Sequence, residues 1–127
     1  MPINPQSRIL VVDDELLIRW SLSETLTAAG YAVVEGRDAA EARQALRDKD
    51  HRPDLVLLDY RLPDSDDLAL LATIRREAPN VPVILMTAHG TEEVVNAALN
   101  LGAYRVVSKP FEVSDMASLV TEALAAR

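Results

Sequence analysis

Short apolar segments alternate with amphipathic segments along most of the chain. Every residue from Leu55 to Leu58 is apolar, and residues 9–12 and 83–86 show the same unbroken pattern. Continuous apolar runs of this length are typical of strands that are covered on both faces. The segments between them carry apolar residues at helical spacing, such as Ile18, Leu22 and Leu26. We therefore expect a sheet that lies between two layers of helices.

The pattern predicts five strands, each followed by a helix. The expected strands are residues 8–13, 31–35, 55–59, 81–87 and 103–108, and the expected helices are residues 15–29, 38–46, 67–77, 91–101 and 114–125. This alternation gives parallel strands joined by right-handed crossovers. The strand order 2-1-3-4-5 suits a chain of five strands. The expected fold is therefore α/β, a flavodoxin-like (βα)5 doubly wound parallel sheet.

Length and composition set the frame for this fold. The chain has 127 residues, of which 49% are hydrophobic, so we expect one domain over residues 1–127, with residues 1–7 as a flexible N-terminus. No apolar run reaches the roughly 18 residues of a membrane span, and residues 1–6 do not resemble a signal peptide. We expect a cytoplasmic protein that contacts no membrane. The net charge of -7 argues against direct binding to nucleic acid.

Four of the expected strands end in residues that can take part in chemistry. These residues are Asp13 and Asp14, then Asp59, then Thr87, and finally Ser108 and Lys109. The carboxyl ends of parallel strands lie along one edge of a sheet, so the side chains should meet in one crevice. In the order 2-1-3-4-5 the first and third strands are neighbours, which brings the three carboxylates together.

Carboxylates gathered in one crevice repel each other. Two unit charges about 4 Å apart repel by roughly 4 kcal/mol at an effective dielectric of 20. A hard divalent cation removes this cost, and an open site completed by water and phosphate oxygens suits Mg²⁺ better than Ca²⁺. With the hydroxyl of Thr87 and the ammonium of Lys109, the carboxylates predict a cation site where a phosphoryl group is handled.

These motifs resemble the receiver domains of two-component response regulators, and the resemblance covers nearly the whole chain. The motifs are ILVVDDE (9–15), LVLLDYRLPD (55–64), VILMTAHG (83–90) and SKPFEVSDM (108–116). They occur in the family's order on the predicted strands, which makes the combination specific. The segment LLIRWSLSETLTAAGY (16–31) is most similar to receivers of NtrC-type transcriptional activators.

The resemblance implies a metal site and a phosphoacceptor. Asp59 would take a phosphoryl group from the phosphohistidine of a sensor histidine kinase. Asp14 and Asp59 would hold Mg²⁺ together with the backbone carbonyl of Arg61, and Asp13 would act through a bound water. The chain would be a regulatory phosphoacceptor that catalyses only its own phosphorylation and dephosphorylation, and no enzyme beyond that.

The resemblance also assigns the remaining residues of the crevice. Lys109 would pair with phosphate oxygens, and the Thr87 hydroxyl would hydrogen-bond the bound phosphoryl group. The bond between Lys109 and Pro110 would be cis, as in many relatives. Phosphorylation would then shift the surface formed by residues 91–101, 103–108 and 114–125. That surface would control an output domain or partner, with transcription as the expected output, or mediate self-dimerisation.

Three positions leave questions open. Val106 stands where receivers usually carry Tyr or Phe, and the nearest aromatic residue is Tyr104, so the ring that turns inward in relatives is missing there. Asp67 replaces the glycine of most relatives. Trp20 lies off the core stripe of its helix and is either a kinase contact or packed against the last helix.

A receiver fold that signals by binding alone, without phosphorylation, remains the alternative function.

Overall fold

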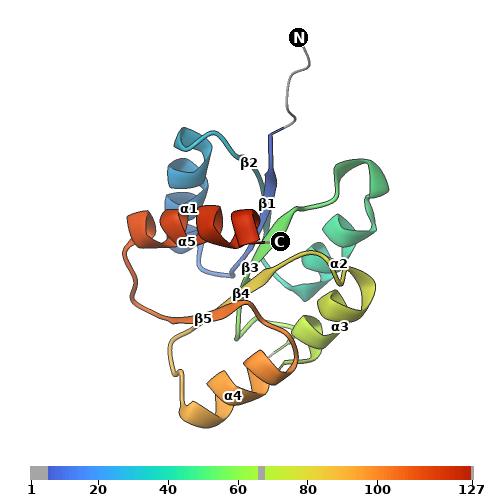
Figure 1. Ribbon diagram of the computed structural model, residues 1–127, viewed down its shortest axis with the longest axis vertical. Coiled ribbons are helices and arrows are strands. Elements are labelled where there is room, and N and C mark those ends of the chain that lie inside the picture. Colours follow the sequence, from blue (N-terminus) through green and yellow to red (C-terminus); the bar gives the residue numbers. More distant parts are fainter. Residues whose placement is uncertain (1–5, 66–67, 127) are drawn as a thin grey trace.

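The computed structural model describes residues 6–65 and 68–126 and shows a parallel sheet between two layers of helices (Figure 1). The strands are β1 (Arg8–Val12), β2 (Ala32–Gly36), β3 (Leu55–Asp59), β4 (Val83–Thr87) and β5 (Arg105–Ser108). Their order is β2-β1-β3-β4-β5, so the predicted flavodoxin-like topology is confirmed. Val12 of β1 lies opposite Leu58 of β3, and the residues that follow these two strands therefore emerge side by side.

The helices are α1 (Leu16–Ala28), α2 (Ala39–Arg47), α3 (Ala69–Glu77), α4 (Glu92–Asn100) and α5 (Val113–Ala126). In Figure 1, α1 and α5 cover one face of the sheet, and α2 and α3 cover the other. Each face has its own core, which includes Leu22, Leu26 and Val120 on the first side and Leu71 and Ile74 on the second. None of the helices in the described part of the chain is long and apolar enough to cross a membrane.

The burial of the strands explains their apolar sequences. Every residue of β3 and β4 is buried, because both strands lie inside the sheet with helices on either face. β5 lies at an edge, and its first and last residues are exposed. The polar ends of the central strands are held by the sheet, because Asp59 pairs with Met86 of β4 and Thr87 pairs with Ser108 of β5.

Two strands begin two residues later than the sequence pattern predicts. β4 begins at Val83 rather than at residue 81, because the carbonyl of Val81 accepts a hydrogen bond from Arg75 at 2.6 Å and Pro82 has no N–H to donate. β5 begins at Arg105 rather than at residue 103, because the Ala103 N–H donates to the carbonyl of Ala98 and closes the end of α4. In both cases a local hydrogen bond replaces the first bond of the strand.

Other boundaries follow from the turns. Gly30 and Gly102 have φ of 99° and 100° and end α1 and α4, because a left-handed residue there favours glycine. Lys49–His51 forms a short 3-10 helix between α2 and β3. The Asp48 side chain starts this turn by accepting the Asp50 N–H at 3.2 Å. The predicted start of the third helix at Asp67 and residues 1–5 of the predicted flexible N-terminus lie outside the described residues.

Candidate functional site

The carboxyl edge of the sheet is hollowed into a pocket with a volume of about 230 Å³. We call it the acidic pocket. Residues that follow β1, β3, β4 and β5 form its walls, which include Asp14, Asp59, Arg61, Thr87 and Lys109. Segments far apart in the sequence therefore supply one site, as expected for a parallel sheet whose strand order reverses at this point.

Three carboxylates converge at this pocket. Asp13, Asp14 and Asp59 each place an oxygen within 4.8 Å of the oxygens of the other two. Asp13 is fully buried, Asp59 is 7% exposed, and Asp14 is open to solvent. Hard oxygen ligands with one side open to water are the donor set that a divalent cation such as Mg²⁺ prefers. The residues present therefore fit a magnesium ion.

Lys109 is the cation that faces these carboxylates. Its Nζ lies 2.9 Å from Asp13 Oδ2, 3.3 Å from Asp59 Oδ1 and 3.4 Å from Glu15 Oε1. The Lys109 side chain is only 10% exposed, so these contacts are shielded from much of the solvent. One ammonium cannot neutralise Asp13, Asp59 and Glu15 together with the neighbouring Asp14. The pocket keeps an excess of negative charge that attracts a further cation.

The electrostatics of the pocket shift two pKa values. Burial, followed by the charge of Asp13, raises the pKa of Asp59 from 3.8 to about 6, against the opposing effects of Lys109 and the Arg61 N–H. Burial by itself lowers the pKa of Lys109, but its hydrogen bond to Asp13 and the attraction of both aspartates outweigh burial and raise it. The lysine therefore stays charged, while Asp59 ionises only when the pH approaches neutrality.

The backbone around Asp13 is fixed from three sides. Its N–H donates to the carbonyl of Gly36 at 3.0 Å, and its Oδ1 accepts the N–H of Glu15 at 2.9 Å. Arg19 of α1 donates from Nη1 to the Asp13 carbonyl at 2.8 Å and also pairs with Glu35 of β2 at 3.0 Å. Asp13 is thus a rigid partner for Lys109, whereas Asp14 projects into solvent.

Thr87 lies at the end of β4, where it is 2% exposed. Its hydroxyl oxygen accepts the N–H of His89 at 3.1 Å, and its carbonyl accepts the N–H of Lys109 at 2.8 Å. A hydroxyl that accepts one hydrogen bond can still donate its own proton. Thr87 therefore places a donor at the pocket wall and also ties β4 to the start of the loop that carries Lys109.

The structure brings Asp14, Asp59, Thr87 and Lys109 to one pocket, and the buried Asp13 joins them through its contact with Lys109. Ser108, which the sequence also placed at this edge, is exposed and is not among the residues that line the pocket. The bond between Lys109 and Pro110 is cis, as the resemblance implies. Sequence reasoning did not identify Glu15 and Arg19 as neighbours of the site. Glu15 directly follows the aspartate pair, and Arg19 lies four residues further along the chain. This spacing could have identified both residues, because the Arg19 N–H donates to the Glu15 carbonyl and the two share a helix face.

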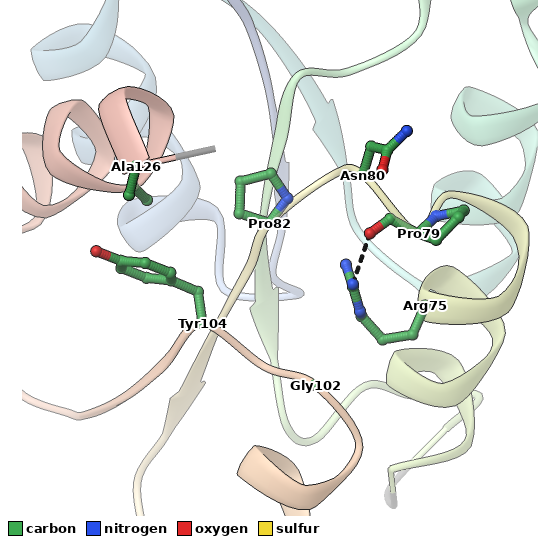
Figure 2. Close-up of a pocket in the computed structure, with 8 residues that line it drawn as sticks. Arg75, Pro79, Asn80, Pro82, Gly102, Tyr104 and Ala126 are labelled. Atoms are coloured by element: carbon green, nitrogen blue, oxygen red, sulfur yellow. Dashed lines mark hydrogen bonds between the residues drawn. The ribbon is translucent and has the colours of Figure 1, made fainter.

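The amino edge of the sheet has a different hollow, with a volume of about 190 Å³ (Figure 2). Arg75 of α3 stands on one side of Pro82 and Tyr104 on the other. The Arg75 guanidinium donates to the carbonyls of Pro79 and Val81, both at 2.6 Å. Its charge is thus used to hold the loop between α3 and β4, and none of the described residues that line this hollow is acidic. The acidic pocket is the stronger candidate site.

Comparison with known proteins agrees with the geometry. The chain matches the response regulator receiver domain over residues 9–121. It is 39% identical to the DNA-binding transcriptional regulator NtrC of Escherichia coli K12 over 116 residues, which cover 91% of this chain and 24% of NtrC. It is 32% identical over 117 residues to sporulation initiation phosphotransferase F of Bacillus subtilis, covering 92% of this chain and 93% of that protein. The chain thus spans about a quarter of the length of NtrC and nearly all of the second relative.

Solved structures show the same fold. The receiver domain of NtrX from Brucella abortus superposes with a TM-score of 0.85 at 36% identity, over 94% of this chain and 99% of that one. A CheY-like receiver domain protein from Methanospirillum hungatei gives a TM-score of 0.90 at 29% identity, over 96% of both chains. On the sequence match over residues 9–121, this chain belongs to the response regulator receiver domain family of two-component systems.

Proposed function

We propose that Asp59 is the phosphoacceptor of this receiver domain and takes its phosphoryl group from the phosphohistidine of a sensor histidine kinase. A carboxylate oxygen of Asp59 attacks phosphorus in line, and an O–P bond forms as the P–N bond to the imidazole breaks. The observation that carries this proposal is the place of Asp59 at the centre of the strand ends, 3.3 Å from Lys109 and within reach of two further carboxylates.

Mg²⁺ is the metal that this donor set fits. Asp14 and Asp59 would hold it with the backbone carbonyl of Arg61, and Asp13 would act through a water. The ion, when bound, neutralises charge that develops on the transferred phosphoryl group. The excess of negative charge around Lys109 supports this assignment, because the pocket gains more from a second positive charge than a balanced ion pair would.

Lys109 and Thr87 complete the proposed machinery. The Lys109 ammonium moves from the carboxylates to the phosphate oxygens as a point charge, and the Thr87 hydroxyl donates a hydrogen bond to the phosphoryl group. Phosphoryl transfer depends mainly on positioning and charge neutralisation, so this set is sufficient for the chain to catalyse its own phosphorylation and dephosphorylation. The burial of Thr87 at the pocket wall supports its role.

The signal would leave through α4, β5 and α5. Ala98 is the buried residue of α4, so this helix is less firmly held than its neighbours. Phosphorylation draws Thr87 and residues 88–91 inward and shifts the α4–β5–α5 surface, which controls an output domain or a partner, or forms a dimer. The likeness to NtrC favours transcription in the cytoplasm as the output.

The signal does not require an aromatic switch. Val106 is partly buried against the core beside α3 and α4. Tyr104 lies before β5, and its hydroxyl donates to Glu122 of α5 at 3.0 Å. This ring is committed to the amino end of the strand, away from Thr87. We propose that the movement of Thr87 reaches β5 through the main chain instead, since the Thr87 carbonyl already holds the Lys109 N–H.

The kinase would dock on α1. Leu16, Leu17 and Trp20 are 70%, 73% and 57% exposed, so Trp20 is not packed away against α5. An apolar hollow beside them is lined by residues that include Leu17, Pro110 and Phe111. Large apolar side chains exposed next to a hollow are typical of a protein contact, and this one adjoins the loop that carries Lys109.

Incubation with Mg²⁺ and acetyl phosphate tests the proposal directly. Intact-mass spectrometry should show one added phosphoryl group on the natural chain and none on Asp59→Asn. Transfer from a phosphorylated kinase should slow about tenfold in Trp20→Ala, while transfer from acetyl phosphate stays unchanged. A chain that gains no phosphoryl group from either donor would instead be a receiver fold that signals by binding alone.

A further inference from the structure

A carboxylate outside the acidic pocket fastens the loop that follows Asp59. Asp64 accepts two backbone hydrogen bonds from the start of α2, from the Ala39 N–H at 2.8 Å and from the Ala40 N–H at 3.1 Å. Asp64 lies five residues after Asp59 and 24 to 25 residues from its partners. The bonds therefore connect two parts of the fold that sequence does not bring together.

The helix has a cap of its own, so it does not depend on Asp64 to begin. The Asp38 side chain accepts the Glu41 N–H at 2.8 Å, and the Asp38 carbonyl accepts the Ala42 N–H at 3.1 Å. Asp64 takes the two remaining N–H groups of the first turn. These bonds, led by that from Ala39, lower the pKa of the Asp64 carboxyl from its usual value, so Asp64 is charged at neutral pH.

The anchored loop leads back to the phosphoacceptor in a few residues. Leu62 is 6% exposed and inserts into the core beneath α2 and α3. Leu62 and Ser65 exchange backbone hydrogen bonds at 2.7 and 3.2 Å, which closes the turn that presents Asp64. Arg61 precedes this turn, and its N–H acts on the Asp59 carboxylate to lower the pKa of that group, against the effect of burial. The position of Arg61 is thus set by a turn that is pinned at Leu62 and at Asp64.

The start of α2 also contacts the other acidic strand end. The carbonyl of Gly36, three residues before Ala39, accepts the N–H of Asp13 at 3.0 Å. The segment from Gly36 to Ala40 therefore touches the backbone of Asp13 on one side and the loop after Asp59 on the other. Loss of the contact at Gly36, or of the contacts at Ala39 and Ala40, would change the separation of the two carboxylate groups that the pocket brings together.

We propose that Asp64 is a positioning residue for the acidic pocket: its two bonds to α2 hold the Arg61 backbone and Asp59 in register with Asp13. This inference rests on the proposed function, in which the backbone carbonyl of Arg61 is a ligand of the metal. Loss of the Asp64 anchor lets the turn move while Leu62 keeps the core closed. The carboxylates then converge less well on a cation, and both metal affinity and phosphorylation fall.

The test compares two caps of the same helix. Asp64→Ala removes the bonds from the phosphoacceptor loop, and Asp38→Ala removes a bond within α2 that does not involve this loop. We expect Asp64→Ala to weaken Mg²⁺ binding about tenfold in calorimetry and to slow the acetyl phosphate reaction comparably. Asp64→Asn keeps one acceptor oxygen and should retain part of the affinity. Asp38→Ala should lower the unfolding midpoint in urea but leave Mg²⁺ binding within about twofold.

The outcomes separate this inference from the proposed function. If the natural chain is phosphorylated and Asp64→Ala binds Mg²⁺ and reacts as the natural chain does, the positioning role is wrong and the proposed function stands. Equal losses of Mg²⁺ affinity in Asp64→Ala and Asp38→Ala would also overturn it, because both would then act through the stability of α2. If the natural chain is not phosphorylated at all, the proposed function fails, and Mg²⁺ binding alone still decides the role of Asp64.

Discussion

A half-buried basic side chain contacts oxygen atoms at each end of the sheet, Arg75 at one and Lys109 at the other, but the two charges are used differently. At the amino edge, Arg75 donates to the backbone carbonyl of Pro79 (Figure 2) and also to that of Val81. At the carboxyl edge, Lys109 faces the carboxylates of Asp13 and Asp59. The partners of Arg75 are neutral carbonyl groups that do not titrate, whereas the carboxylates that contact Lys109 can bind protons, metal or a phosphoryl group.

The difference separates a structural charge from a functional one. The carbonyls around Arg75 carry no net charge and each accepts a hydrogen bond from the guanidinium, so they need no second cation. The carboxylates around Lys109 still repel each other, and the charge of Asp13 adds to the effect of burial in raising the pKa of Asp59. Unbalanced charge in a pocket costs stability, so it marks a site that is completed by something else.

Replacement of Lys109 or of Arg75 should give the largest effects on the free energy of unfolding, and the two effects should respond differently to Mg²⁺ and to pH. Lys109→Met leaves Asp13 buried without a cation and should lower the free energy of unfolding by about 3 kcal/mol at neutral pH. Arg75→Met loses two hydrogen bonds to carbonyls and should cost about 1–2 kcal/mol. Urea unfolding followed by circular dichroism measures both. Added Mg²⁺ or a lower pH should restore much of the loss in Lys109→Met and none in Arg75→Met; equal responses would break the comparison.

Removal of the repulsion at Asp59 should stabilise the metal-free chain. The pKa of Asp59 rises from 3.8 to about 6 on folding, so the folded state binds its proton more tightly than the unfolded state. The stabilisation that comes from this tighter proton binding is fully present below the unfolded pKa of 3.8, and it is lost as the pH rises through about 6. Asp59→Asn should therefore gain about 1–2 kcal/mol near neutral pH, discounted because the pocket opens to solvent.

Unfolding in EDTA at several pH values tests this gain. The stabilisation by Asp59→Asn should shrink between about pH 6.5 and 5, and excess Mg²⁺ should reverse it because the natural chain alone keeps all three carboxylates. A gain that does not change with pH would mean that asparagine packs better there, and that charge is not the cause.

The smallest effects concern the two left-handed glycines. Gly102→Ala places a Cβ 2.9 Å from Arg75 Nε at a φ of 100°, and it should cost about 1–2 kcal/mol. Gly30→Ala has a φ of 99° and no atom within 4 Å of the added Cβ, so it should cost only about 1 kcal/mol. The difference in thermal unfolding midpoint measures the contact with Arg75. Neither change should alter phosphorylation by acetyl phosphate.

The fold was predictable where burial is uniform. β3 matches residues 55–59 as predicted, because an unbroken apolar run has few other solutions in a chain of this size. The starts of β4 and β5 were misplaced, because hydrogen bonds from Arg75 and to Ala98 compete there with the sheet. Such competition depends on the approach of another segment, which the apolar pattern does not encode.

The pocket was predictable because the reactive side chains lie at the carboxyl ends of parallel strands, which meet at one edge of the sheet. Asp13 and Asp14 directly follow β1 and Asp59 ends β3, so topology alone places them together. The anchor at Asp64 was not predictable in the same way. It lies in a turn after Pro63, and its partners are backbone N–H groups of a helix 24 to 25 residues away. Backbone donors have no side-chain signature, so only the structure reveals this contact.

The exposed position of Trp20 has a practical consequence for spectroscopy. It is the single tryptophan of the chain and is 57% exposed on α1. Its emission should change little when the core unfolds, because the indole is already in contact with water in the native state. The same fluorophore should respond strongly when a protein covers α1. Tryptophan fluorescence will therefore report association at this helix, while circular dichroism must report unfolding.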